Sequence, residues 1–370
     1  MYPHSAGVLG LAHPPYGWRL SPSIPHLAHT LGAHGYSTTL VGMQHLIDRG
    51  SAHELGYAHV LPVAPAYEEA DAAVARLREL SHAERPFYLE VGFEEPHRPY
   101  DFGGAQPDTT RGVNIPGYLP DVPEARQDLA AFQGAIRQMD AGVGRILAGL
   151  EDLDIVDSTL VIFATDHGAA MPRAKCTLYD PGIEVAILLR WPAFGLIGGR
   201  VVSNLLSNVD VTPMLLDGLG IAPPGRLQGH SFWPLLTGST AYAPRAEVFA
   251  EKTFHTYYEP MRAVRTDHHK LIVNFEVSTR VDVPSDIRQS PIYPLMLSQF
   301  DDVRPTVELY DLTSDRWEQR NLAGAAEYAS IERDLRQRLL EWMRATDDPL
   351  LAGPVASPYF TDALSTLGAA

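Results

Sequence analysis

Residues 158–168 read STLVIFATDHG, and this stretch indicates the fold class. It is apolar nearly throughout as far as Ala164, which is typical of a strand buried on both faces of a parallel sheet. An aspartate and a histidine, Asp166 and His167, follow the strand at once. Open parallel sheets bind ligands in the crevice outside the carboxyl ends of their strands. The stretch therefore predicts an α/β fold and marks a first candidate site.

Helices and strands alternate on both sides of this stretch, as expected for a mostly parallel sheet flanked by helices. The longest predicted helix carries apolar residues at alternating steps of three and four. The predicted elements are strands within 36–42, 85–93 and 184–192 and helices over 23–34, 66–80 and 123–150.

The character of the sequence changes after about residue 245. Strand-like runs at 270–277 and 307–312 precede a helix predicted over 323–345, which favours a smaller antiparallel sheet. We expect an α/β domain over residues 1–245 and a smaller C-terminal α+β subdomain over 246–370.

Composition excludes several classes of protein. The net charge of −16 argues against a nucleic-acid surface, and no run is long and apolar enough for a membrane span. One cysteine, Cys176, excludes an internal disulfide and has no adjacent base in the sequence, so we expect a buried inert thiol.

Polar side chains follow three of the predicted strands. His45 follows the strand at 36–42, His97 follows the strand at 85–93, and Asp166 and His167 follow the strand at 158–168. The loop after Gly168 brings Lys175 back toward the same edge. An aspartate and a histidine can bind one divalent metal, while histidines and a lysine can neutralise an anion or move protons. The combination suits hydrolysis of a charged ester.

Each of these residues also has an ordinary structural interpretation. His45 alone is more typical of a hydrogen-bonded loop residue, Asp-His-Gly can form a turn, and Lys175 taken singly is typical of a solvated surface charge. The first sixty residues hold eight histidines, but no H-E-x-x-H or paired C-x-x-C motif supports a zinc site.

The chain resembles the sulfatases of the alkaline-phosphatase-like superfamily along nearly its whole length. The similar segments include GYSTTLVGMQHL (35–46), EEPHRPY (94–100), TLVIFATDHG (159–168), KCTLYDPGIEVAILLRWP (175–192) and VDVTPMLLDGLGI (209–221). Within the family, PMRAVRTDHHKLIVNFE (260–276), ELYDLTSDRWEQRNLA (308–323) and TDDP (346–349) are most similar to the heparan N-sulfatase branch.

The resemblance implies a site in which a divalent metal, calcium first and manganese or magnesium otherwise, binds sulfate beside a formylglycine. By this resemblance Asp166 and His167 are metal ligands. His45, His97 and Lys175 contact the sulfate or protonate the leaving group. The implied substrate is a small anionic sulfated molecule, with a glycan as one candidate.

Two departures from the family pattern bear on activity. The family lysine of G-K-x-H is Met43 here, which removes a cation from the sulfate site. The paired metal-binding aspartates and the C/S-x-P-S-R nucleophile motif are absent from the sequence, while the opening MYPHSAGVLG resembles the loop that follows that motif. We therefore expect a chain that lacks its N-terminal catalytic segment and is inactive by itself.

Other interpretations remain open from the sequence. The chain could be a shortened homologue that only binds anions or a partner, or a phosphonate or phosphodiester hydrolase of the same superfamily. A homo-oligomer is expected if apolar sheet edges are exposed. A cytoplasmic location follows if Met1 is the true start, and export is open if a segment precedes it.

Overall fold

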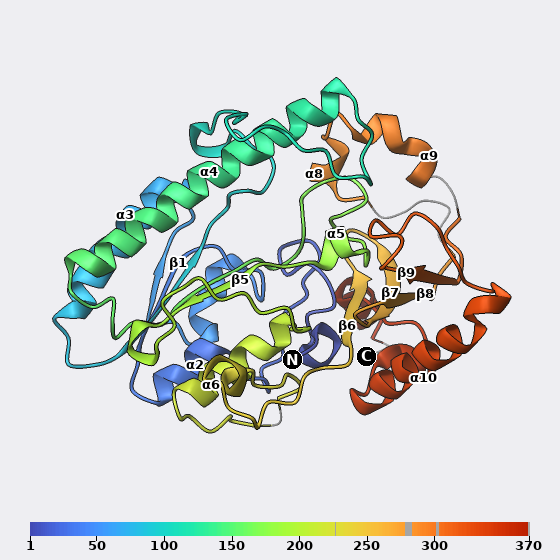
Figure 1. Ribbon diagram of the computed structural model, residues 1–370. Coiled ribbons are helices and arrows are strands. Elements are labelled where there is room, and N and C mark those ends of the chain that lie inside the picture. The colour runs from blue at the N-terminus through green and yellow to red at the C-terminus, as the bar shows by residue number, and fades with distance from the viewer. Residues whose placement is uncertain (226, 278–282, 301–302, 369–370) are drawn as a thin grey trace.

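A parallel sheet of three strands forms the centre of the first part of the chain. The computed structural model describes residues 1–225, 227–277, 283–300 and 303–368 (Figure 1). Strand β1 (Ser37–Gly42) lies between β2 (His59–Leu61) and β3 (Phe87–Gly92), and all three run parallel. Because β1 has a neighbour on each side, its residues from Thr38 onward are buried. The predicted parallel sheet is confirmed.

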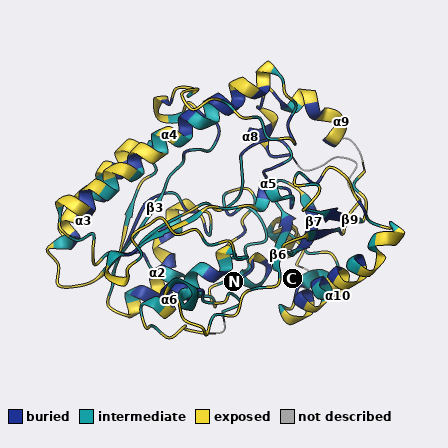
Figure 2. Cartoon of the chain, viewed as in Figure 1, coloured by how far each residue is buried: buried dark blue, intermediate teal, exposed yellow. Residues whose placement is uncertain are grey.

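Helices cover both faces of this sheet (Figure 1). On one face, α3 (Ala66–Ser81) packs against α4 (Pro123–Asp152), and Figure 2 shows their exposed residues on the outer side. A Cβ at Gly142 would come within 2.9 Å of the Ala66 carbonyl oxygen, so glycine is what allows this close approach. On the other face, α2 (Leu27–Ala33) and α6 (Val211–Gly218) share one apolar cluster.

The strand that indicated the fold class is placed differently from the prediction. Strand β4 (Val161–Ala164) pairs antiparallel with β5 (Ile187–Arg190), and in the described residues this pair forms its own two-stranded sheet. Its first three residues are half-buried and Ala164 is exposed, so the expectation of burial on both faces was wrong. Ile162 packs against the apolar cluster that α2 and α6 share, whereas Val161 and Phe163, on the opposite face of the strand, belong to none of the apolar clusters in the part of the chain that the structure describes.

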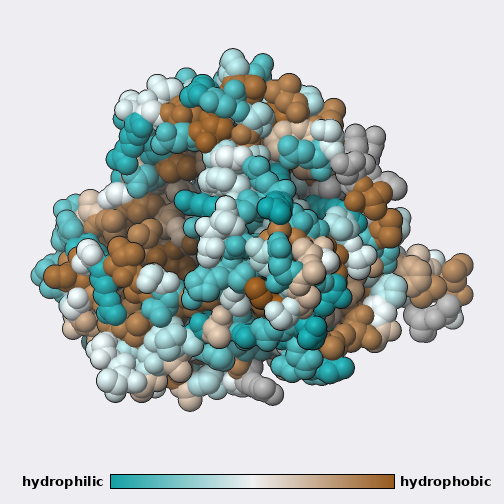
Figure 3. Space-filling view, turned by 45° about the vertical axis from the view of Figure 1, so that its right-hand side comes forward, coloured by the Kyte–Doolittle hydropathy of each residue, from teal (hydrophilic) through white to brown (hydrophobic). Residues whose placement is uncertain are grey.

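Apolar surface is accordingly exposed around the two sheets. Leu188 on β5 is 61% exposed, and Ile197 and Val201 lie exposed in the segment that follows. Figure 3 shows apolar residues gathered around a hollow on the face that it presents.

A second sheet forms the later part of the chain. Its four antiparallel strands follow one another in order: β6 (Val248–Phe254), β7 (Tyr258–Arg265), β8 (His269–Asn274) and β9 (Val307–Asp311). Helix α10 (Ala329–Ala345) packs Leu335 and Leu339 against this sheet, and Figure 2 shows the buried strands β7 and β9. The predicted antiparallel sheet and terminal helix are present, although β6 and β7 were not foreseen and the helix begins at 329.

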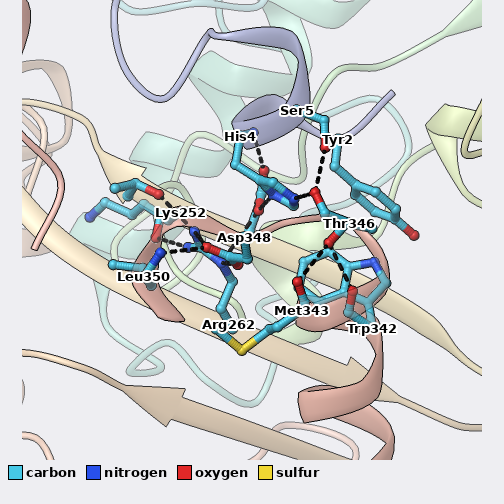
Figure 4. A network of polar contacts seen from close by, with 12 residues as sticks. Tyr2, His4, Ser5, Lys252, Arg262, Trp342, Met343, Thr346, Asp348 and Leu350 are labelled. Carbon is cyan, nitrogen blue, oxygen red and sulfur yellow. Dashed lines mark hydrogen bonds and ion pairs between the residues drawn. The ribbon is translucent and has the colours of Figure 1, made fainter. Parts of the chain in front are cut away.

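The first helix, α1 (Pro3–Ala6), is fastened to this second sheet (Figure 4). His4 pairs through Nδ1 with the Glu251 carboxylate, and its Nε2 lies 3.2 Å from the Thr346 carbonyl oxygen. The fully buried Arg262 donates to Asp348 at 2.5 Å and lies 3.4 Å from Glu251. The boundary proposed at residue 245 precedes β6, yet polar contacts join the two parts.

The remaining helices are short; four of them lie between the larger elements, and α11 lies near the end of the chain. They are α5 (Asp180–Ile183), α7 (Trp233–Leu236), α8 (Ser285–Arg288), α9 (Leu297–Phe300) and α11 (Pro358–Thr366). Within the described ranges, none of the helices has the length and apolar character needed to cross a bilayer.

Candidate active site

His97 and Lys175, which the sequence placed at one edge of the sheet, are in contact. His97 lies in the turn after β3, and Lys175 lies in the loop between β4 and α5. The Lys175 ammonium is 3.1 Å from His97 Nε2 and 2.7 Å from Asp286 Oδ2. Asp286, on α8, also lies 3.6 Å from His97 Nε2. Three segments far apart in the sequence therefore meet at one cation.

The backbone fixes the proton arrangement of His97. Its Nδ1 lies 2.5 Å from the carbonyl oxygen of Arg98, which can only accept, so Nδ1 carries the hydrogen. In the neutral ring Nε2 then has a free lone pair, and it accepts from Lys175. The pair thus shares a proton between Lys175 Nζ and His97 Nε2, as general acid or base chemistry requires.

Lys175 is not the solvated surface charge that its sequence context suggested. It is only 9% exposed, and a buried ammonium needs a charged or hydrogen-bonded partner. Burial acts to raise the pKa of Asp286, but the hydrogen bond and charge of Lys175 outweigh it, so that pKa lies below its ordinary value. The Asp286 carboxylate is therefore ionised in the fold at neutral pH.

A second buried ion pair supports this contact. Arg98 donates to Asp128 of α4, with Nη1 2.8 Å from Oδ1, and its guanidinium lies over the Tyr100 ring. Ser290 donates to the other Asp128 oxygen at 2.6 Å. The His97 turn and the segment after α8 are thereby held by one carboxylate.

Asp166 and His167 follow β4, as predicted. Asp166 is exposed, and its Oδ1 accepts from the His167 amide at 2.9 Å. His167 Nδ1 donates to the Gly168 carbonyl at 2.8 Å, which leaves the Nε2 lone pair available 3.8 Å from Asp166 Oδ2. A backbone bond of this kind is how proteins orient metal-binding histidines.

These two side chains fit part of a metal site. They offer one oxygen and one nitrogen ligand, but in the residues that the structure describes no further histidine, cysteine or carboxylate joins them in a compact group. Asn208 is nearby, but its amide nitrogen donates to the Thr165 carbonyl at 3.1 Å. Asp166 and His167 therefore supply two ligands rather than a complete coordination shell.

His45 lies within electrostatic reach of the other candidates. The pKa of His45 is lowered, and burial is the largest cause. The charges of Arg49, His13 and His97 also lower it, while the charge of Asp166 raises it. The charges of His97 and Asp166 therefore act on His45, although β4, which precedes Asp166, belongs to a separate two-stranded sheet and not to the sheet of β1 and β3. A histidine held neutral in this way can accept a proton.

Arg49 and Asp286 were missed by sequence reasoning. The Arg49 guanidinium lies 3.9 Å from Met43 Sδ, so a cation stands near the position where the family has lysine. No local pattern marks either residue. One compositional signal was available, because the chain contains only three lysines among 29 basic residues, and all three are buried.

The histidines of the first sixty residues form no zinc site of their own in the described part of the chain. The group of potential ligands found there is His4, Glu251 and Asp348, where Arg262 already supplies positive charge (Figure 4). Because Arg262 pairs with both carboxylates and His4 pairs with Glu251, these groups are already partners of one another, and we interpret them as an ion-pair network.

A cavity of about 540 Å³ lies apart from the predicted site residues. It lies between residues 117–120 and the second sheet. Arg173 at its wall donates to the Trp317 carbonyl, and Tyr179 and Tyr310 donate to Glu308. Because these polar groups bind one another, the cavity gives no indication of a ligand.

Comparison with known proteins identifies the class of protein to which the chain belongs. The sulfatase family model matches residues 1–221, more than half of the chain, so the chain belongs to the sulfatase family of sulfuric ester hydrolases. A second model, N-sulphoglucosamine sulphohydrolase, C-terminal, matches residues 173–292.

Individual relatives support the same assignment, including the heparan N-sulfatase branch. The chain is 28% identical to human N-sulphoglucosamine sulphohydrolase over 412 residues, covering 95% of this chain and 80% of the relative. Among solved structures, a 2-O GAG sulfatase superposes with a TM-score of 0.72 at 22% identity, covering 96% of this chain and 82% of the other. Another, in complex with its substrate D-glucosamine-2-N,6-O-disulfate, has a TM-score of 0.68 at 17% identity and covers 94% and 88%. The predicted family, branch and fold are confirmed.

Proposed function

We propose that this chain binds the sulfate group of a small sulfated amino sugar and that its site residues serve hydrolysis of that group. The observation that carries the proposal is the 3.1 Å contact between the Lys175 ammonium and His97 Nε2. The contact supports the proposal because it joins a cation to a group that can share its proton. A sulfate that develops charge on its leaving atom needs both.

Each residue then has a role in the proposal. Lys175 and Arg49 attract and orient the anion, and the proton shared between Lys175 Nζ and His97 Nε2 passes to the leaving oxygen or nitrogen, which leaves the lysine and the histidine both neutral. His45, held neutral by its surroundings, is a second proton acceptor. Asp166 and His167 would hold a divalent metal, calcium first and manganese or magnesium otherwise, which when bound supplies further positive charge to the sulfate.

The substrate class is inferred from the relatives. The human relative is named for N-sulphoglucosamine, and a structural neighbour was solved with a sulfated glucosamine. We therefore propose an amino sugar with an N-sulfate group, free or at the end of a glycan.

Turnover by these 370 residues alone is not expected. The C/S-x-P-S-R motif, which carries the formylglycine in the family, and the paired aspartates are absent from the sequence. We expect aryl sulfate hydrolysis at background level. Measurable turnover that disappears in an Asp166→Ala variant would contradict this expectation.

Binding is the direct test of the proposal. Calorimetric titration with glucosamine N-sulfate in the presence of Ca²⁺ should give binding that unsulfated glucosamine does not. His97→Gln and Lys175→Met should each weaken it by about tenfold or more, since each removes a hydrogen bond to a charged group. Equal binding of both sugars, or no effect of either variant, would refute the proposal. Stronger binding of an aryl phosphate diester would instead favour a phosphodiester hydrolase.

A further inference from the structure

Asp286 comes to the site from a segment that is remote in the sequence. It lies 111 positions beyond Lys175, on a short helix outside the α/β part of the chain. Its neighbour Ile287 is 1% exposed and belongs to the same apolar cluster as Leu129 of α4 and Met171. The position of Asp286 is therefore fixed by packing.

The Asp286 carboxylate is placed to hold one particular nitrogen. An ammonium has three N–H donors. One bond from Lys175 goes to Asp286 at 2.7 Å and one to His97 at 3.1 Å. Among contacts within the described residues these two use two donors, which leaves the third to meet an anion.

His97 and Asp286 are held by a common support. Arg98, next to His97, and Ser290, four residues after Asp286, both donate to the carboxylate of Asp128. Asp128 is itself 4% exposed. The spacing between the histidine ring and the carboxylate is thus set by a buried network and not by loop conformation.

We propose that Asp286 is a positioning residue, which anchors the Lys175 ammonium so that one N–H is aimed at His97 Nε2 and another at the bound anion. The inference rests on the proposed sulfate site. In that site Asp286 contacts no substrate atom and acts through Lys175.

If Asp286 positions Lys175, removing its carboxylate should change the affinity for an anion in the direction opposite to the one that charge alone predicts. Removing a carboxylate makes the site one charge more positive, which by Coulomb attraction alone should tighten the binding of an anion. If Asp286 positions Lys175, its removal should weaken that binding.

Glu94 provides a control matched in charge. Its Oε1 lies 3.9 Å from His97 Nδ1, close to the 3.6 Å that separates Asp286 from Nε2. It makes no contact with Lys175 in the described part of the chain. Glu94→Gln therefore removes the same charge without releasing the Lys175 ammonium, and it also releases the Arg49 guanidinium, which lies 3.9 Å from Glu94 Oε2 and is then freer to meet the anion.

The first measurement is the affinity for inorganic sulfate by calorimetry. We expect Asp286→Asn to weaken sulfate binding about tenfold, Asp286→Glu to fall between it and the wild type, and Glu94→Gln to leave binding unchanged or tighter. Equal tightening in Asp286→Asn and Glu94→Gln would overturn the positioning role.

The second measurement does not depend on sulfate binding. Labelling lysine with ¹⁵N gives at most three side-chain ammonium signals, from Lys175, Lys252 and Lys270, and Lys175→Arg assigns the first. We expect a slowly exchanging Lys175 signal in the wild type and in Glu94→Gln, and its loss in Asp286→Asn. The Lys252 and Lys270 signals report that the fold is intact. A Lys175 signal that persists in Asp286→Asn would overturn the inference.

The two measurements separate the inference from the proposed function. Sulfate binding that Lys175→Met leaves unchanged would refute the sulfate site, while the ammonium signal would still decide the role of Asp286. If Asp286→Asn does not fold, Asp286→Glu decides: a Lys175 signal displaced while the other two stay fixed supports the role, and an unmoved signal overturns it.

Discussion

Lys175 is a buried cation at the centre of the candidate site. Its side chain is 8% exposed and that of Asp286 is 12% exposed, so the pair is largely removed from water. Lysine occurs only three times in this chain. A lysine side chain is ordinarily mobile and solvated, whereas Lys175 is buried and paired.

Replacing one member of this pair should cost stability. We expect Lys175→Met to lower the free energy of unfolding by about 3 kcal/mol, because the Asp286 carboxylate is left buried without its cation. Urea unfolding measures this. The double variant Lys175→Met/Asp286→Leu should recover much of the loss; a double variant as unstable as the sum of the two single changes would contradict the coupling.

Residues that act at strand ends were predictable because their position follows from local pattern. An apolar run ending in Asp166 and His167 identifies the carboxyl end of a strand without knowledge of the rest of the chain. Asp286 was not predictable, since a contact across 111 positions depends on tertiary packing that no local pattern encodes. Lys175 is buried because of this contact, and the residues next to Lys175 in the sequence do not indicate that burial.

At the scale of elements, strands were predicted where their burial follows the apolar pattern. The strand at β1 and the long helix α4 were found where expected. Strands β6 and β7 were missed because they carry the buried charges Lys252, Glu259 and Arg262, which pair across the sheet and hide its apolar alternation. The antiparallel pairing of β4 with β5 was missed because an apolar run does not specify strand direction.

Helix α3 carries a buried carboxyl group beneath the end of β1. Glu69 Oε1 accepts from the Ala64 amide at 3.0 Å, while Oε2 is buried without a hydrogen-bond partner in the described residues. Burial raises the pKa of Glu69 to about 7, with the charges of Glu95 and Glu94 adding to it and the Ala64 bond opposing it.

Stability should therefore fall as the pH rises toward neutrality. Between about pH 4 and 7 the folded chain keeps the Glu69 proton that the unfolded chain has lost, so the free energy of unfolding decreases with pH in this window. Glu69→Gln cannot ionise and should gain up to about 3 kcal/mol over the wild type from pH 4 to 8. Chemical denaturation at several pH values tests this, with the exposed Glu68→Gln as control. A constant difference between Glu69→Gln and wild type would show that Glu69 titrates normally.

At the scale of the molecule, the network around Arg262 joins the first helix to the second sheet (Figure 4). Arg262→Met should destabilise the chain by about 4 kcal/mol, because it leaves the Asp348 carboxylate buried and unpaired. Removing an exposed ion pair in Arg126→Met, where Arg126 and its partner Asp121 are both exposed, should cost less than about 1 kcal/mol. Similar unfolding midpoints for the two variants would mean that the buried network contributes little.

The exposed sheet edges predict how the chain behaves in solution. Because β4 lacks a neighbour on one edge in the described residues and apolar residues surround a hollow (Figure 3), we expect self-association and binding of an apolar dye. Light scattering should give a mass above the 40.6 kDa of one chain. A well-folded monomer without dye binding would contradict this expectation.

The central claim is that Lys175 and His97 form a site for a sulfate group. A crystal structure of the chain with glucosamine N-sulfate and Ca²⁺ tests it most directly. The claim predicts a sulfate oxygen within hydrogen-bonding distance of Lys175 Nζ, with the sugar nitrogen facing His97 Nε2. A sugar bound elsewhere, for example in the cavity beside Arg173, with no sulfate at Lys175, would contradict it.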